Sequence, residues 1–520
     1  MSNPSFEIFP YSIDQLKKSI IEKTYAKTHH IDSKLHNTYL KDYFNALEAK
    51  TILIENDYID RDFLEDFAGY YVWCFTPYRR KCFRFHFFSM SFSQGDFEAL
   101  LKGTGGLLSQ ENLQNTYLGF TVIKPLPQTI IGRTCLKTYP DDGRRYFPTV
   151  RCYNPNLFGI PLKIDTLAFQ EQDQVVAACA TSALWSVFQK TGKLFSHPIP
   201  SPVEITNTAS IFAPLETRIL PNKGLSVYQM THAIRSVKLE PFLVKAQNEH
   251  VLKSTLYAYL NGQIPLLMGI DLVDTSDNNK IWGKHAVAIT GYSLGNKTAI
   301  QYGSTGILLK ASRIDKIYVH DDQVGPFARM IFDNVSLVLN GTPVNSISTS
   351  WIGRNGVIGS VRAIPDNILA PLYHKIRIPF NVIHDTIIPF DGIIEAARIK
   401  GIIPLLERLE WDIFLTTIND LKTHFFHSHC LGDGEYCCKV LLENMPKYIW
   451  RAIALNKNRP LIELLFDATD IEQGTLFIRA VEYDQTLAVA LRTLSKVPKF
   501  AAGLRTKLEW KIFEWFEKQP

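Results

Sequence analysis

The sequence contains no long hydrophobic run and no concentrated block of charge. No uninterrupted apolar stretch is long enough to span a bilayer, and the first residues, MSNPSFEIFPYSIDQLKKS, include no apolar core of signal-peptide length. Lysine and arginine number 56 against 51 aspartates and glutamates, an excess too small over 520 residues to indicate nucleic-acid binding by itself. We therefore expect a cytoplasmic protein with no membrane span and no nucleic-acid partner.

Zinc-finger spacings of the usual kind, RNA-binding aromatic signatures, internal repeats and low-complexity tracts are also missing. The eight cysteines are few for this length, and in a cytoplasmic protein we expect most of them to be free thiols. Hydrophobic residues make up 46% and charged residues 21%, which is typical of a globular protein. A chain of this length should form two or three domains.

The pattern of apolar residues divides the chain into three regions and predicts an α+β fold. Residues 1–165 combine a polar helical pattern with aromatic strand candidates such as CFRFHFF, in which apolar and polar side chains alternate. Residues 166–345 show helices followed by a set of antiparallel strands. The segment LNGTPVNSISTSWIGRNG indicates a loop or linker. Residues 365–520 are predicted to be mostly helical, because apolar positions recur every three or four residues.

One cysteine is distinguished by its surroundings. Cys179 lies in FQEQDQVVAACATSALW, near the start of an apolar helical run that ends at Gly192. A helix N-terminus favours the thiolate, because the helix dipole and the unpaired amides stabilise negative charge. A free cysteine between alanines is more often a small buried hydrophobic residue. The local sequence leaves both interpretations open.

Two later motifs supply the partners that a cysteine nucleophile needs. In WGKHAVAITGY, His285 is predicted to be the first residue of a strand and could act as the base. In IYVHDDQVGPF, a strand ends in Asp321 and Asp322, and a carboxylate there could fix the tautomer of the imidazole. The combination of Cys179, His285 and Asp321 favours nucleophilic catalysis, with Asp322 as the alternative carboxylate.

The middle region resembles papain-fold cysteine peptidases, and most closely those similar to the bacteriocin-processing (double-glycine) peptidases. The resemblance rests on AACATSALW, GLSVYQMTHAI, AYLNGQIPLLMGI, HAVAITGY and YVHDDQVGPF in this order, and it covers about a third of the chain. It implies a papain-like domain in which an N-terminal helix carries the cysteine and an antiparallel sheet carries the histidine and the aspartate. Cys179 then matches the nucleophile, His285 the base and Asp321 the orienting carboxylate.

The resemblance also implies a glutamine about six residues before the cysteine, whose amide helps to form the oxyanion hole. Asp173 occupies that position here, between Gln172 and Gln174, and Ala180 replaces the usual glycine after the cysteine. We assign the oxyanion role to Gln172, with Gln174 as the alternative. The expected activity is that of a thiol hydrolase, a cysteine peptidase that cleaves a peptide or amide bond through an acyl-enzyme on Cys179 without a cofactor.

Two other functions fit the same motifs. Transglutaminases and arylamine acetyltransferases also use cysteine, histidine and aspartate, so an amine could replace water as the acyl acceptor. A papain-like domain could also serve only as a scaffold for protein binding, since a fold does not guarantee an activity. In the peptidase interpretation the substrate is a protein or peptide, and the flanking regions select the substrate or bind a protein partner.

A short stretch near the C-terminus, HFFHSHCLGDGEYCCK, is rich in side chains that could bind zinc. These are His424, His427, His429, Cys430, Cys437 and Cys438. Their spacing matches no common zinc pattern, and adjacent cysteines point in different directions on a helix. We favour a loop with incidental histidines, followed by a helix whose cysteines face a core, over a zinc site.

Overall fold

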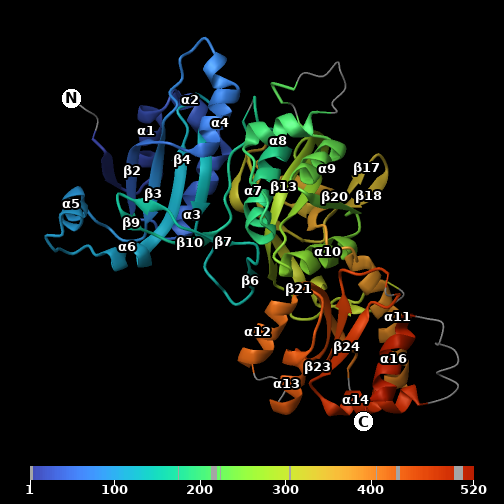
Figure 1. Cartoon of the computed structure of the whole chain (residues 1–520). Helices are drawn as coiled ribbons and strands as arrows, with labels where there is room; N and C mark the ends of the chain where they lie inside the picture. The colour runs from blue at the N-terminus through green and yellow to red at the C-terminus, as the bar shows by residue number, and fades with distance from the viewer. Residues whose placement is uncertain are drawn as a thin grey trace. The chain divides into compact units, whose positions relative to one another are not determined.

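The computed structural model forms two compact units, each assembled from three segments of the chain (Figure 1). The first unit comprises Met1–Gln247, Ile264–Ser293 and Lys316–Pro371, and the second comprises Asn248–Gln263, Leu294–Asp315 and Leu372–Pro520. The structure describes residues 4–173, 175–211, 219–222, 224–303, 306–405, 407–428, 434–472, 474–496 and 508–519. Both units combine helices and strands, which confirms the predicted α+β class.

The first unit begins with a five-stranded antiparallel sheet whose strands are neighbours in chain order. The strands are β1 (Phe6–Pro10), β2 (Thr51–Tyr58), β3 (Cys82–Phe88), β4 (Tyr117–Ile123) and β5 (Ile131–Leu136). The predicted strand CFRFHFF is β3, and both of its faces are buried. Its polar side chains therefore need internal partners: the Arg84 guanidinium donates to Glu55 at 2.7 Å, and His86 Nδ1 lies 3.0 Å from the Tyr117 hydroxyl.

Two short helices carry residues of this region toward the second sheet of the same unit. They are α2 (Thr28–Asp32) and α3 (Leu35–Ala46). One face of α3 packs its Tyr43 and Phe44 into the aromatic core, where the Phe44 and Phe87 rings lie 4.2 Å apart. The Tyr39 hydroxyl donates to the backbone carbonyl of Pro326, and α3 contacts strand β16. Residues 1–165 are thereby joined to the strands that carry the candidate site.

The second sheet of this unit supports the histidine and the aspartates. In spatial order its strands are β11 (Leu239–Lys245), β20 (Val361–Tyr373), β12 (Leu266–Asp274), β13 (Lys280–Leu294), β15 (Ile314–Asp321), β16 (Gly325–Ile331) and β19 (Ile347–Ser348). The pairs β12–β13 and β15–β16 are antiparallel. Helix α7 (Cys179–Phe195) contacts β12, and all its residues from Ala180 to Gly192 are buried. A helix with this pattern belongs to the core rather than to the surface.

The second unit contains a sheet where the sequence predicted mostly helices, so that prediction was wrong. Strands β21 (Glu410–Thr417), β22 (Tyr448–Asn456), β23 (Arg459–Asp467) and β24 (Phe477–Glu482) form an antiparallel meander, and β14 (Leu308–Leu309) pairs with β21 in parallel. Residues along β21, β22 and β23 are buried on both faces, so their apolar residues do not alternate. A short continuous apolar run cannot be told from a buried helix by periodicity.

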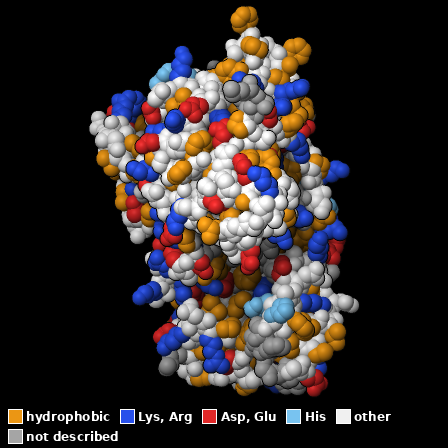
Figure 2. Space-filling view, turned by 90° about the vertical axis from the view of Figure 1, so that its left-hand side faces the viewer, with side chains coloured by type: hydrophobic (Ala, Val, Ile, Leu, Met, Phe, Trp, Pro, Cys, Tyr) orange, Lys and Arg blue, Asp and Glu red, His pale blue; other side chains and the backbone are white. Residues whose placement is uncertain are grey.

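The second unit also contains helices, which lie before, between and after these strands along the chain. They are α10 (Glu249–Asn261), α11 (Phe380–Ile399), α12 (Ile418–Ser428), α13 (Gly434–Leu442), α14 (Gln485–Ser495) and α16 (Leu508–Lys518). None of the helices in the described part of the chain is long and apolar enough to cross a membrane. Basic and acidic side chains are interspersed over the face of the molecule shown in Figure 2.

Candidate active site

Cys179 is the first residue of α7, where backbone amides have no partner within the helix. The N-cap residue, Ala178, makes no side-chain hydrogen bond to these amides. The amides and the helix dipole favour negative charge on the sulfur and on an oxygen bound beside it. The Cys179 side chain is partly exposed, so a substrate can reach it.

The loop that leads into α7 is fixed by Asp173, at the position where the resemblance implies a glutamine. The Asp173 carboxylate accepts hydrogen bonds from the backbone amides of Val175 (2.8 Å) and Val176 (3.1 Å) and from the Tyr71 hydroxyl. These bonds occupy the side chain and fix the turn that precedes Cys179. Asp173 is thus a positioning residue for the backbone.

His285 lies on β13 opposite Ile270 of β12, and its side chain is only 5% exposed. Its Nε2 lies 3.1 Å from Asp321 Oδ1, and the Cys179 side chain is close enough to the ring to raise its pKa. Burial lowers the pKa of His285, but the charges of Asp321 and Asp322 and these contacts outweigh burial and raise the pKa well above its usual value. The imidazolium is therefore the stable form beside the sulfur.

Strand β13 begins before His285, so the prediction that this histidine opens the strand was wrong. Lys280 and Ile281 already pair with Asp274 and Val273 of β12. Pairing with β12 extends the strand through Gly283, although a glycine at this position is typical of a loop. His285 consequently lies inside a paired strand, with paired residues before and after it, which restricts its side-chain position.

Asp321 is the last residue of β15, at the predicted end of the strand. Its Oδ2 accepts a hydrogen bond from Trp351 Nε1 at 2.7 Å, and its Oδ1 accepts one from the Gln323 amide at 3.1 Å. Burial raises the pKa of Asp321, but the charge of His285 and the hydrogen bonds from His285, Trp351 and Gln323 lower it below its usual value. An ionised Asp321 is thus held against the imidazolium.

Asp322 is buried beside the same histidine but is bonded differently. Its Oδ1 lies 3.5 Å from His285 Nε2, and among the described residues neither carboxylate oxygen has a hydrogen-bond partner in another residue. Burial raises the pKa of Asp322 to about 7, and the negative charge of Asp321 adds to this rise. The closer contact and the greater number of donors at Asp321 favour Asp321 as the carboxylate that orients His285.

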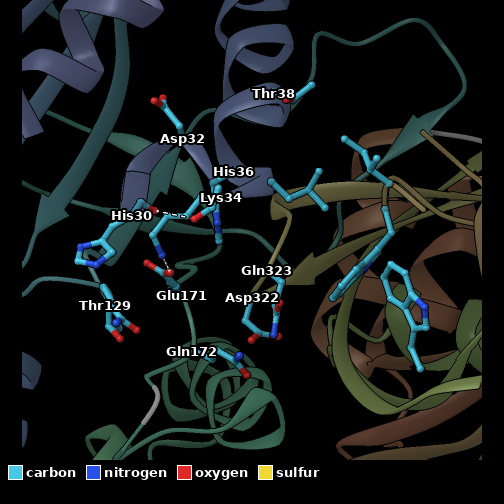
Figure 3. A pocket seen from close by; sticks show the side chains of 16 residues that line it. His30, Asp32, Lys34, His36, Thr38, Thr129, Glu171, Gln172, Asp322 and Gln323 are labelled. Carbon is cyan, nitrogen blue, oxygen red and sulfur yellow. Dashed lines mark hydrogen bonds and ion pairs between the residues drawn. The ribbon is translucent and has the colours of Figure 1, made fainter. Parts of the chain in front are cut away.

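Asp322 lines a cavity of about 700 Å³ within the first unit, and Cys179, His285 and Asp321 are not among the residues that line it. Gln172 and Asp322 line it together with Trp351, and Figure 3 shows Gln172 and Asp322 with residues contributed by α2 and α3. The structure therefore places the predicted oxyanion residue in the wall of the cavity that Asp322 also lines. The alternative, Gln174, lies outside the described residues.

A second group of buried charges fixes α7 at a residue further along the helix. In this Arg133 cluster, Asp62 Oδ2 accepts hydrogen bonds from Arg133 Nη2 at 2.6 Å and from Trp185 Nε1 of α7 at 3.0 Å. Asp60 lies 3.6 Å from Arg133 and accepts a hydrogen bond from the backbone amide of Phe63. These residues come from the region before residue 165, so that region anchors the helix that carries the cysteine.

The sequence interpretation missed three residues that surround the site. Trp351 comes from the segment that was predicted to be a linker, yet it bonds to Asp321 and its ring lies 5.4 Å from the His285 ring. His36 and Glu171 also line the cavity. A single tryptophan in a segment of glycine, serine, threonine and asparagine is a weak signal that the segment packs against the folded protein instead of lying free as a linker. No comparable signal marks His36 or Glu171.

The structure brings together one group of three side chains that could hold a metal ion, among the residues it describes. The ligand atoms of His285, Asp321 and Asp322 lie within 4.8 Å of one another. A histidine and two carboxylates suit a divalent cation. In the observed geometry, however, Asp321 bonds to His285 and to Trp351. This arrangement fits a proton-transfer pair better than a metal centre.

The histidine- and cysteine-rich stretch near the C-terminus forms two helices where it is described. His424 and His427 lie on α12, and Cys437 and Cys438 lie on α13, so the predicted loop around the histidines was wrong. Cys437 packs against a hydrophobic cluster, in agreement with the predicted core contact, whereas Cys438 is exposed. These four residues do not come together as a metal-binding group. His429 and Cys430 lie outside the described residues.

Comparisons with known proteins add no relative at this point. No protein-family model matches the chain, and no curated protein matches it significantly.

Proposed function

We propose that the protein is a thiol hydrolase with a papain-like domain, a cysteine peptidase that cleaves a peptide or amide bond through an acyl-enzyme on Cys179. The observation that carries the proposal is the 3.1 Å contact between His285 and Asp321, together with the influence of Cys179, the first residue of α7, on the pKa of that histidine. A nucleophile, a base and a group that orients the base are the parts that thiol-dependent acyl transfer requires.

In the proposed reaction the Cys179 thiolate attacks the carbonyl carbon of the scissile bond. The Nε2 of His285 faces Asp321, which leaves Nδ1 for the bond to sulfur and for proton donation to the leaving amine. The Cys179 amide and the side-chain amide of Gln172 stabilise the oxyanion. Water, activated by the neutral imidazole, then attacks the thioester, releases the acid and restores the thiolate–imidazolium pair.

The pH dependence of Cys179 alkylation tests this proposal. The intact protein is treated with iodoacetamide from pH 5 to pH 9, and labelling is read by peptide mass spectrometry, with the exposed Cys152 and Cys438 as internal reference thiols. We expect Cys179 to react at pH 6 at least about tenfold faster than the reference thiols, because an ion-paired thiolate persists below the usual thiol pKa of about 8.5.

Substitution of the base provides the control for that measurement. His285→Ala should move the Cys179 profile upward toward about pH 8.5, whereas His427→Ala, at an exposed position on α12, should leave it unchanged. A Cys179 that follows the profile of Cys438 in the parent protein would contradict the proposal. So would a Cys179→Ala protein that cleaves its substrate at the parent rate.

A further inference from the structure

The cavity beside the candidate site contains two buried hydrogen-bond acceptors that the protein leaves unused. The first is Asp322, which is 3% exposed and whose oxygens have no hydrogen-bond partner in another described residue. The second is Nε2 of His36, a side chain that is 4% exposed and lines the same cavity. Buried polar groups are normally paired, so two unpaired groups on one cavity indicate a missing partner.

The neutral ring of His36 has one nitrogen without a partner. Burial lowers the pKa of His36, so the ring is neutral and carries a single N–H. Its Nε2 has no hydrogen-bond partner among the described residues. In the tautomer with the proton on Nδ1, Nε2 accepts a hydrogen bond. Above the raised pKa of Asp322, about 7, the Asp322 carboxylate also only accepts, so both groups then suit a hydrogen-bond donor.

The charged residues around these acceptors do not supply that donor. Lys34 also lines the cavity, but its ammonium pairs with Glu171. The second oxygen of Glu171 accepts hydrogen bonds from the backbone amides of Ile130 (3.1 Å) and Ile131 (3.0 Å). The Lys34–Glu171 pair is thus satisfied internally. A guest in the cavity would meet Asp322 and His36 as buried groups without a partner.

Two indole rings complete a wall that suits a positively charged guest. Trp282 and Trp351 both line the cavity, and their ring centroids lie 6.1 Å apart. The faces of indole rings attract cations, most strongly where water is excluded. The unpaired polar groups and the aromatic ring faces of this cavity both favour a positively charged hydrogen-bond donor as the guest.

We infer that this cavity binds a positively charged N–H donor of the substrate, an ammonium or a guanidinium group, through Asp322 and His36. The inference rests on the proposed function, because it identifies the substrate as a peptide with a basic side chain or a free amino terminus near the cleaved bond. Asp321 thereby serves the chemistry of His285, and Asp322 serves recognition.

Binding of matched peptides to the full-length Cys179→Ala protein tests the inference without any cleavage. The probes are acetylated hexapeptide amides with lysine, arginine, norleucine or glutamate at each position in turn, and the norleucine set with a free amino terminus. Arrayed peptides identify the best sequence, and calorimetry then compares it with its counterparts. Lysine or arginine at one position should bind at least about tenfold tighter than norleucine, since an ion pair in a buried site is strong. A preference for the free amino terminus would identify that group as the source of the charge.

Substitutions in the same background decide whether Asp322 is responsible. Asp322→Asn should reduce the cationic preference to less than about threefold, and His36→Phe should weaken it while keeping a ring in place. Asp32→Asn is the matched control, because Asp32 lines the same cavity but has a side chain that is 54% exposed and already pairs with Lys17. This control should keep the preference.

Each outcome of the test bears on one proposal. Neutral peptides that bind as tightly as cationic ones, or a cationic preference that survives Asp322→Asn, would overturn the inference. So would the absence of peptide binding in a protein whose Cys179 shows the activated alkylation profile. A cationic preference that depends on Asp322, in a protein whose Cys179 behaves as an ordinary thiol, would support the inference and contradict the peptidase proposal.

Discussion

The Arg133 cluster and the group formed by His285, Asp321 and Asp322 both bury two aspartates beside one cationic side chain, but they pair them differently. In the Arg133 cluster each aspartate accepts a hydrogen bond from another residue. In the His285 group Asp321 is fully engaged, and Asp322 is left without a donor. Both groups leave buried atoms without a hydrogen-bond partner, and in the Arg133 cluster these are Asp62 Oδ1 and Arg133 Nε, but of the four aspartates Asp322 alone lacks a partner on both carboxylate oxygens. A buried carboxylate that no donor stabilises is costly unless a ligand binds it. We interpret the Arg133 cluster as an anchor for α7 and the His285 group as the site of the proposed chemistry and binding.

The largest expected effect comes from breaking the Arg133 cluster. Arg133→Met leaves the buried Asp60 and Asp62 without their cationic partner, which should cost about 3 kcal/mol of unfolding free energy. Denaturant unfolding followed by tryptophan fluorescence measures this cost. Lys102→Met is the control, because Lys102 is 66% exposed and its pair with Glu98 should contribute less than about 1 kcal/mol. Equal losses in the two variants would show that the cluster does not anchor the unit.

An intermediate effect is expected from the tryptophan that bonds to Asp321. Trp351→Phe removes the donor 2.7 Å from Asp321 Oδ2 and should cost about 1–2 kcal/mol of stability, since the acceptor is charged. It should also slow Cys179 alkylation at pH 6 by about threefold, because the pKa of Asp321 rises and that of His285 falls. The exposed Trp73 provides the control substitution, Trp73→Phe. An unchanged alkylation rate would show that Trp351 has no part in orienting the catalytic pair.

The smallest effect, and one of opposite sign, is expected from Asp322. Its pKa is raised to about 7, so between about pH 4 and pH 7 the folded protein retains a proton that the unfolded chain has released. The folded state therefore loses stability as the pH rises through this range. Asp322→Asn removes the loss, and the variant should gain on the order of 1 kcal/mol relative to the parent between pH 5 and pH 8.

Asp62→Asn, measured in the same unfolding experiments, compares an aspartate of the Arg133 cluster directly with Asp322. Asp62 accepts hydrogen bonds from Arg133 and Trp185, so the amide should destabilise the protein at pH 8. Opposite signs for the two aspartate-to-asparagine changes would support the division between anchor and site. Destabilisation by Asp322→Asn at pH 8 comparable with that by Asp62→Asn would show that Asp322 is also an anchor.

Some features of the site could be predicted from local sequence, and others could not. The helix that begins at Cys179 and the strand that ends at Asp321 both follow from short apolar patterns with clear limits. The order of the motifs indicated which residues should meet. Trp351, Gln323 and the unpaired state of Asp322 depend on how distant segments pack, and no local pattern encodes such packing.

The errors have a common physical origin in pairing between strands. His285 was assigned to the start of its strand because the preceding residues lack a strand pattern, yet they pair with β12. In residues 365–520 the apolar spacing predicts helices, although segments of eight or nine residues pair with neighbouring strands and are mostly buried. Partners remote in sequence decide both cases, and single-sequence periodicity carries no information about them.

The complete burial of α7 from Ala180 to Gly192 has a consequence for the motions that could expose the sulfur. A helix with no solvent-facing side cannot unwind locally without opening the sheet beneath it, so its amide protons should exchange with solvent only in rare, large openings of the unit. Reagents and substrates that reach Cys179 thus meet it in the closed native arrangement. The position of Cys179 relative to His285 is therefore fixed when the unit folds, and it does not depend on substrate binding.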